Sequence, residues 1–515
     1  MPRYKPYDYN QLLLVPVSLE DQLAPGTLEY AIHRLIEERI DTSLFDEQYR
    51  NDETGRSAYD PKVLLKIVLF AYSRGLLHSR RMERACKENV TFMALACGQK
   101  PDHSTLAAFI SAMGEERIVN LFTQVLLICE QDGLLGGTHF SLDGLKLSSN
   151  ASKEWSGTQA ELLKKKAKLE QKVKATIREH REGDLRGGDQ DEQRQQKRIR
   201  RLERQAERIE KFLAENKPKQ GRRGKEIQSN VTDNESAKMV SSHGVVQGYN
   251  ANALVDEKHQ VVVQAEAFGD GDDASSAGPM LQGAKRNLTA VGCGSEPLKD
   301  KVISADTGYY SVENLEACRD EEVDAYIPDR EFRKRDPRFA EAQRHRRSVD
   351  KHKQRYKSKK RWFTPEDFRL DERTGKLICP AGHGLYLNGR NYEINGYRAI
   401  SYRAPKTACR ACPLRAKCLR NPNTAQRQVR LFYGHRPGSL TDAMKQKIDT
   451  PEGRKTYSQR LRIVEPVFGN IRAQKRLDRF TLRGRRKVNI QWRLYCLVHN
   501  IEKILHFGRS FVMAA

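Results

Sequence analysis

Apolar residues along this chain follow two spacings, which predict two kinds of structure. From residue 1 to about 125 they recur three or four positions apart, as in Val63, Leu64, Ile67 and Val68, and this spacing predicts helices. From about residue 137, short apolar runs of strand length alternate with polar turns. Their order predicts three strands, a helix, a strand, a helix and a strand. The expected fold class is therefore α/β, with a mixed sheet and a helical N-terminal domain.

A highly charged segment, residues 157–224, interrupts the strand pattern. Glycines at 183, 187 and 188 divide it, and the second half carries apolar residues at heptad spacing. This pattern predicts an antiparallel helical hairpin inserted into the sheet domain. The hairpin either contacts DNA or a second subunit, or it is a solvated structure without a specific partner. The seam residues are Ile199, Leu202, Ala206, Ile209 and Leu213.

A second interruption begins with residues 330–361, which are strongly basic. Such a segment is typical of an arm that lies on phosphates and also of a solvated linker. Further along, Asn395-Gly396 stands between aromatic and β-branched residues and predicts a hairpin turn.

Four cysteines of this region have a spacing that suits a metal. Cys409 and Cys412 are separated by two residues, a gap that brings two thiolates onto one tetrahedral ion. Cys379 and Cys418 complete a four-cysteine set for structural Zn²⁺. His383 is a competing ligand, and four reduced surface thiols are the alternative without metal.

The C-terminal part returns to helical spacing. The segment 457–475 predicts a helix with a kink or restart at Glu465, because a residue before proline is biased away from helical backbone. Apolar residues from Ile490 to Leu505 then predict an amphipathic helix that closes the core.

These changes of pattern predict five divisions. They are a helical N-terminal DNA-binding domain (1–125), the first part of the catalytic core (126–156 and 225–330), the charged hairpin insertion (157–224), a basic, cysteine-bearing insertion (331–450) and C-terminal helices that complete the core (451–515). Within the first division, Arg80 and Arg81 follow a short turn and are candidates for DNA contact. The alternative is a helical packing domain with a solvated basic face.

Charge narrows the class of partner. The 515 residues carry a net charge of +25, which favours a polyanion, with nucleic acid first and a membrane surface second. No apolar run reaches the roughly 18 residues that a membrane span needs. The first ten residues lack the apolar core of a signal peptide. We therefore expect a cytoplasmic, nucleoid-associated protein, in which ten cysteines are not a disulfide framework.

Three carboxylates stand inside apolar runs, where an unpaired charge is costly to bury. Asp306 ends the run that begins at Lys301, Asp143 lies in an alternating run, and Glu465 follows Ile463-Val464. Hard oxygen ligands of this kind can hold two divalent ions and leave room for a phosphodiester. Our hypothesis is that the three share divalent metal and that the chain cuts and joins DNA.

Several motifs resemble the DDE transposases of bacterial insertion sequences, in the branch with a cysteine-bearing insertion. The resemblance rests on Pro101-Asp102-His103-Ser104-Thr105, Ser141-Leu142-Asp143-Gly144, Gln247-Gly248-Tyr249-Asn250-Ala251, Ser304-Ala305-Asp306-Thr307-Gly308-Tyr309, Ile463-Val464-Glu465-Pro466-Val467-Phe468-Gly469, and the cysteines with Cys412-Pro413-Leu414-Arg415. It implies an RNase H-like catalytic core and the triad Asp143, Asp306 and Glu465 with Mg²⁺ or Mn²⁺.

The resemblance also implies the partners and the reaction. The enzyme would bind the terminal inverted repeats of its element as a homodimer or larger assembly, nick them, and join 3′ hydroxyls to target DNA. Residues implied near phosphate are Arg472, Lys475 and either Arg460 or Arg462, because four residues rather than three separate Arg460 from Glu465. A metal-dependent nuclease without strand transfer and an inactive DNA-binding protein are the alternatives.

Overall fold

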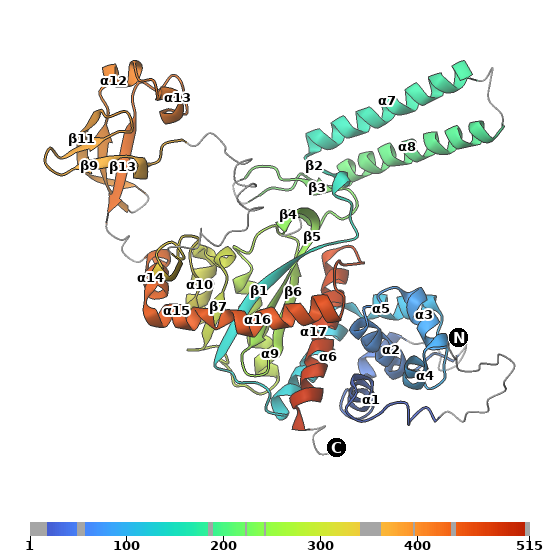
Figure 1. Ribbon diagram of the computed structural model, residues 1–515. Coiled ribbons are helices and arrows are strands. Elements are labelled where there is room, and N and C mark those ends of the chain that lie inside the picture. Colours follow the sequence, from blue (N-terminus) through green and yellow to red (C-terminus); the bar gives the residue numbers. More distant parts are fainter. Residues whose placement is uncertain are drawn as a thin grey trace, which may run out of the picture. The chain divides into compact units, whose positions relative to one another are not determined.

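The computed structural model describes residues 18–48, 57–183, 189–221, 224–241, 244–339, 362–394, 397–433 and 439–509 (Figure 1). The chain divides into two compact units. Unit 1 comprises Met1–Tyr326 and Thr456–Ala515, and unit 2 comprises Ile327–Lys455. Most of the predicted basic arm, residues 340–361, and the Asn395-Gly396 turn lie outside the described residues.

The N-terminal part of unit 1 is helical. Its helices are α1 (Leu28–Glu38), α2 (Pro61–Ser73), α3 (Ser79–Glu88), α4 (Val90–Leu95), α5 (His103–Ala112) and α6 (Gly114–Gln131). Pro61 opens α2, where the side chain of Asp60 accepts a hydrogen bond from the Lys62 N–H. The helix is buried from Val63 to Ser73, because its neighbours and the C-terminal helix α17 (Arg485–Phe507) surround it.

A mixed sheet forms the centre of unit 1. Its strands are β1 (His139–Ser148), β4 (Ala237–Ser241), β5 (Gly244–Asp256), β6 (Val262–Phe268), β7 (Val302–Ala305) and β8 (Asp324–Tyr326). The strand order is β4-β5-β1-β7-β8, and β6 also pairs with β5. β5 runs antiparallel to β1, β4 and β6, while β1, β7 and β8 are parallel. The sequence predicts these strands in this order except β4, a short strand with an exposed Val240 that carries little apolar pattern.

Helices cover the sheet. α9 (Ala277–Ala290) packs on β5 and β6, and α10 (Val312–Asp320) packs on α9. α17 lies along β6 and hydrogen-bonds to its backbone. Asn500 bonds both the N–H and the carbonyl of Val262, and Asn489 does the same for Ala267. The C-terminal helix therefore closes the core and also satisfies polar groups of β6.

Glu465 and Pro466 lie inside a continuous helix, α16 (Arg460–Gly469), which packs on β1. The predicted restart at Glu465 is wrong; the helices α15 (Pro451–Ser458) and α16 are instead separated at Gln459. A proline inside a helix leaves the carbonyl four residues earlier without its donor, here the carbonyl of Arg462. The side-chain amide of Gln260 donates to this oxygen at 2.9 Å and replaces the missing N–H.

The charged segment forms two long helices, α7 (Gln159–Gly183) and α8 (Asp189–Glu215), which pack against each other (Figure 1). At their base the two-residue strands β2 (Ser156–Gly157) and β3 (Ser229–Asn230) pair. A small apolar cluster of Leu162, Ile209 and Val231 joins helices and strands there.

Unit 2 contains an antiparallel sheet in the order β13-β12-β11-β10-β9. Its strands are β9 (Arg369–Asp371), β10 (Lys376–Ile378), β11 (Gly384–Ile394), β12 (Tyr397–Arg403) and β13 (Gln428–Tyr433), and its helices include α12 (Lys406–Arg410), α13 (Arg415–Cys418) and α14 (Leu440–Asp449). Phe368, Leu377, Leu385, Tyr402 and Val429 form its own core.

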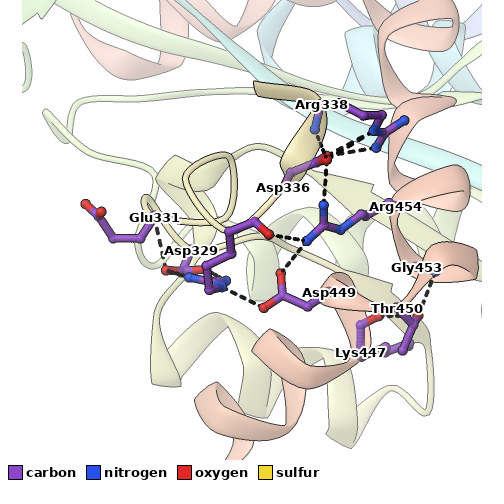
Figure 2. A network of polar contacts seen from close by, with 10 residues as sticks. Asp329, Glu331, Asp336, Arg338, Lys447, Asp449, Thr450, Gly453 and Arg454 are labelled. Carbon is purple, nitrogen blue, oxygen red and sulfur yellow. Dashed lines mark hydrogen bonds and ion pairs between the residues drawn. The ribbon is translucent and has the colours of Figure 1, made fainter. Parts of the chain in front are cut away.

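Ion pairs connect the first and last segments of unit 2 (Figure 2). Arg335 pairs with Asp329 and, at 2.6 Å, with Asp449. Arg454 pairs with the buried Asp336 at 2.8 Å and with Asp449 at 3.5 Å. The network therefore fixes the two points at which the chain enters and leaves this unit.

Candidate active site

Asp143 and Asp306 come from neighbouring parallel strands. Leu142 of β1 lies opposite Ala305 of β7; Asp143 is the next residue of β1, and Asp306 directly follows the end of β7. Asp306 also accepts a hydrogen bond of 2.7 Å from the Gly308 N–H, which holds the turn after β7. Two of the three predicted catalytic carboxylates therefore lie side by side.

Arg460 reaches this pair from α16. Its Nη1 lies 2.7 Å from Asp143 Oδ2, and both side chains are largely buried. Burial raises the pKa of Asp143 to about 6; Arg460 counteracts this shift and the charge of Asp306 adds to it. The geometry assigns Arg460 to the carboxylate site, whereas Arg462 is exposed and lies 3.7 Å from Glu257.

A third aspartate, Asp273, joins the site and was missed by the sequence argument. A Cβ atom on Gly308 would lie 2.8 Å from Asp273 Oδ2 and 2.9 Å from Asp306 Oδ1, so the two carboxylates flank this glycine. Burial raises the pKa of Asp273, while Asn250 and Lys146 lower it and Asp306 raises it. Its signal in the sequence was its position in the Asp- and Gly-rich loop after a strand, similar to that of Asp306.

Buried polar atoms without partners surround these aspartates. Within the described ranges, Asn250 Oδ1 and both polar side-chain atoms of Asn252 have no hydrogen bond. A Cβ atom on Gly144 would lie 2.7 Å and 2.6 Å from the Asn250 and Asn252 oxygens, so only glycine leaves this space open. Burial, followed by the charges of Asp273, Asp143 and Asp306, raises the pKa of Tyr309.

Such a concentration of carboxylate and amide oxygens suits Mg²⁺ or Mn²⁺. In the part of the chain that the structure describes, however, no three His, Cys, Asp or Glu side chains form a group that could hold a metal ion. The site therefore fits a divalent ion by its oxygen donors and by its buried polar atoms without partners. To bind the ion, the carboxylates would have to move closer together.

Glu465, the third predicted carboxylate, lies on the surface of α16. It is exposed on α16, while Ile463, Val464 and Val467 form the buried side of the helix. It makes no hydrogen bond or ion pair with any residue whose placement is described. Its place in a triad remains a prediction from the resemblance.

The predicted DNA contacts separate into exposed and buried residues. Arg80 and Arg81 are exposed on α3, and Arg472 is half-buried. Lys475 is completely buried and pairs with Glu502 at 2.5 Å, so this charge holds the fold together and we remove it from the DNA contacts. The sequence around Lys475 gave no sign that Glu502, which lies much further along the chain, would pair with it.

Arg81 lines a basic groove of about 460 Å³. His78, Arg476 and Arg479 line the same groove, and Arg479 donates a hydrogen bond of 3.1 Å to Asn150, just beyond β1. The groove therefore gathers cations from the helical N-terminal region and from the segment that follows α16, next to the end of β1.

In unit 2, the four predicted zinc cysteines line one small pocket of about 30 Å³, together with His383. The His383 N–H donates to Cys379 Sγ at 3.3 Å, and the Arg427 N–H donates to Cys409 Sγ at 3.4 Å. Burial raises the pKa of the Cys418 thiol, and the neighbouring Cys379, Cys409 and Cys412 raise it further. Cys379, Cys409, Cys412 and Cys418, spread over the sequence, are thus gathered at one place.

No helix in the described ranges is long and apolar enough to cross a membrane.

Two family models match the chain. Residues 378–505 match the model described as a transposase DDE domain, and residues 17–112 match the model described as a transposase domain (DUF772). A comparison with curated proteins found no match. The first match includes Glu465 and the four cysteines, and Asp143 and Asp306 lie between the two. The two matches support the assignment of this chain to the DDE transposases of insertion sequences.

Proposed function

We propose that this enzyme binds the terminal inverted repeats of its own element, nicks them with divalent metal and joins 3′ hydroxyl ends to target DNA. One observation carries the proposal. Asp273 and Asp306 flank Gly308, and Asp143 lies beside Asp306 on the neighbouring strand. Buried amide oxygens of Asn250 and Asn252 that lack partners in the described chain lie next to them. A carboxylate cluster of this kind is what metal-assisted phosphodiester chemistry requires.

The proposal includes an RNase H-like core. It is supported by the strand order, in which β5 and β6 are antiparallel and β1, β7 and β8 are parallel neighbours. On this interpretation the α7–α8 hairpin and unit 2 are insertions into the core, and α16 and α17 complete it.

Asp143 and Asp306 would hold Mg²⁺ or Mn²⁺, with Asp273 or Glu465 as the third carboxylate. When bound, the ions activate water or a 3′ hydroxyl and stabilise the leaving oxygen. Arg460 holds the Asp143 carboxylate in place through its 2.7 Å ion pair. Lys146, 3.9 Å from Asp273, compensates part of the negative charge before metal arrives.

DNA contact is assigned to cations of unit 1 that are exposed or half-buried. Arg81 in its groove and Arg80 beside it would bind phosphates, and Arg462 and Arg472 would contact DNA near the aspartates. Pairing of two element ends implies a homodimer or larger assembly on DNA, and the substrate places the enzyme at the nucleoid in the cytoplasm.

The cysteines of unit 2 are proposed to hold one structural Zn²⁺. The support is that all four line one pocket, and that backbone N–H groups already donate to two of the sulfur atoms. Thiolates accept such hydrogen bonds when they bind zinc.

The test uses labelled duplexes from the DNA that flanks the coding sequence, incubated with Mg²⁺ or with EDTA. Wild type is compared with Asp306→Asn, Asp273→Asn and Glu465→Gln at matched DNA occupancy. We expect metal-dependent nicking and joined products from wild type. Asp306→Asn should lose at least about 100-fold in rate, roughly the effect of removing a residue that stabilises transition-state charge.

Asp273→Asn and Glu465→Gln identify the third carboxylate, because only the residue that belongs to the site should match the loss of Asp306→Asn. Nicking without joining would replace the proposal with a metal-dependent nuclease. Binding without any metal-dependent cleavage would indicate an inactive DNA-binding protein.

A further inference from the structure

A row of cations follows one side of α8. Their spacing of three or four residues places them on one face of the helix, opposite the apolar seam of Leu202, Ala206 and Ile209. They line a groove of about 510 Å³ with Trp155 and Gln205. The row consists of Lys197, Arg200, Arg201, Arg204 and Arg208.

These charges have no anionic side-chain partner in the part of the chain that the structure describes. Among the described residues, Lys197, Arg200, Arg201 and Arg204 have no ion pair or hydrogen bond from their side chains. Like charges three and four residues apart on a helix destabilise it by a few tenths of a kcal/mol per pair. One cation of α7, Lys166, is by contrast paired with Glu210 at 2.8 Å. We therefore expect this row of cations to bind an anionic ligand.

Trp155 gives the groove a fixed aromatic end. The Lys165 Nζ lies 5.0 Å from its ring centroid and the Arg208 Cζ lies 5.7 Å from it. The half-buried ring packs against the apolar cluster at the base of the hairpin, which includes Ile209. The groove is thus anchored where the hairpin joins the rest of unit 1.

The length of the row suits a nucleic-acid backbone. From Lys197 to Arg208 the helix rises about 16 Å at 1.5 Å per residue. About five base pairs of duplex DNA, at 3.4 Å per phosphate of one strand, have the same length. A protein partner fits less well, because protein interfaces use single arginines between apolar side chains, whereas five adjacent cations and one aromatic ring line this groove.

We propose that α8 and Trp155 form a binding surface for the backbone of duplex DNA, separate from the aspartate site and from the Arg81 groove. The inference rests on the proposed function, which makes DNA the substrate. Through this surface the hairpin insertion would bind DNA independently of its base sequence, because contacts to phosphates position a duplex but do not read its bases.

The test removes three of the charges in the full chain with Arg200→Gln, Arg201→Gln and Arg204→Gln. The matched control is Lys164→Gln, Lys174→Gln and Arg178→Gln, which removes the same charge from exposed residues of α7 that do not line the groove. Binding of a fluorescent duplex of mixed sequence, about 30 base pairs long, is measured by anisotropy in EDTA over a series of salt concentrations. Circular dichroism checks that both variants keep their helices.

The groove variant should bind more weakly, and its slope of log affinity against log salt should fall by about 2 to 3, since each phosphate contact contributes about 0.9. The control should stay close to wild type. Equal losses in the two variants would show that only net charge matters and would overturn the proposal. An unchanged slope together with lost self-association in sedimentation would overturn it too, and would assign the row to a second copy of the chain.

These outcomes are distinct from those of the cleavage test. If the hairpin surface is wrong, wild type still nicks DNA with Mg²⁺. If the proposed function is wrong, the difference in salt slope between groove variant and control persists while no cleavage occurs.

Discussion

Asp143 carries an electrostatic cost in the folded chain that is absent from the unfolded chain. Burial raises its pKa to about 6, against the counteracting charge of Arg460 and with the added charge of Asp306. A carboxyl group of an unfolded chain ionises near pH 4. As pH rises from about 4 to about 6, the unfolded state therefore loses this proton first, and folding stability falls and stays lower above pH 6.

Asp306→Asn should therefore stabilise the metal-free protein. The substitution removes a like charge beside Asp143 but keeps the Oδ1 atom that accepts from the Gly308 N–H at 2.7 Å. We expect a gain of about 1 kcal/mol in the free energy of unfolding at pH 8, typical when an active-site strain is relieved. Urea titrations without divalent ions measure it, and the gain should shrink toward about pH 4, where Asp143 is protonated.

The control for this measurement is Asp320→Asn on the exposed end of α10, where a surface substitution changes stability by less than about 0.5 kcal/mol. A destabilised Asp306→Asn protein would show that the Asp306 charge is fully compensated in the folded chain, and the electrostatic account of the cluster would fail.

Single residues were predictable where an apolar run pointed to them. Asp143 and Asp306 each interrupt or end such a run, and the structure places them on adjacent strands. Asp273 lies in a polar loop, where no apolar periodicity predicts which way a side chain faces. Only the packing around Gly308 therefore reveals it. Lys475 was mistaken for a surface cation because its partner Glu502 lies in a different helix.

At the scale of elements, α16 shows why a local rule failed. Proline disfavours helix for the preceding residue and removes one N–H. In this fold Gln260, from the turn between β5 and β6, donates to the Arg462 carbonyl and lets the helix continue. The order of strands and helices was readable from spacing because it depends on local pattern, whereas this contact depends on a residue far away in the sequence.

A double-mutant cycle measures that contact. Gln260→Ala should cost about 1 kcal/mol, the usual net value of a hydrogen bond. In a Pro466→Ala background the cost should be smaller, because the substitution restores a backbone N–H that bonds the Arg462 carbonyl instead. Gln260 Oε1 also accepts from Lys503 Nζ at 3.0 Å, and Lys503→Met isolates that contribution. Equal costs in both backgrounds would mean that Gln260 does not compensate for the proline.

At the scale of the whole molecule, the two units have separate cores. The compact unit runs from Ile327 to Lys455, slightly beyond the segment 331–450 that composition predicts. Its ends are set by the ion pairs of Arg335 with Asp449 and of Arg454 with Asp336, which join residues far apart in sequence. Composition marks such a unit, but the exact contacts that close it are not encoded in any local pattern.

A unit with its own core can lose structure by itself, and the cysteine pocket should control this loss in unit 2. We expect one Zn²⁺ per purified chain by elemental analysis. Cys412→Ser should remove the metal and accelerate amide hydrogen exchange across residues 362–433, because structural zinc contributes folding free energy. Exchange in α2 and α17 should stay unchanged. Cys293→Ser, which removes an exposed thiol of unit 1, should retain zinc and wild-type exchange. A wild-type chain without zinc, or equal exchange in the two variants, would leave the four cysteines as ordinary reduced thiols.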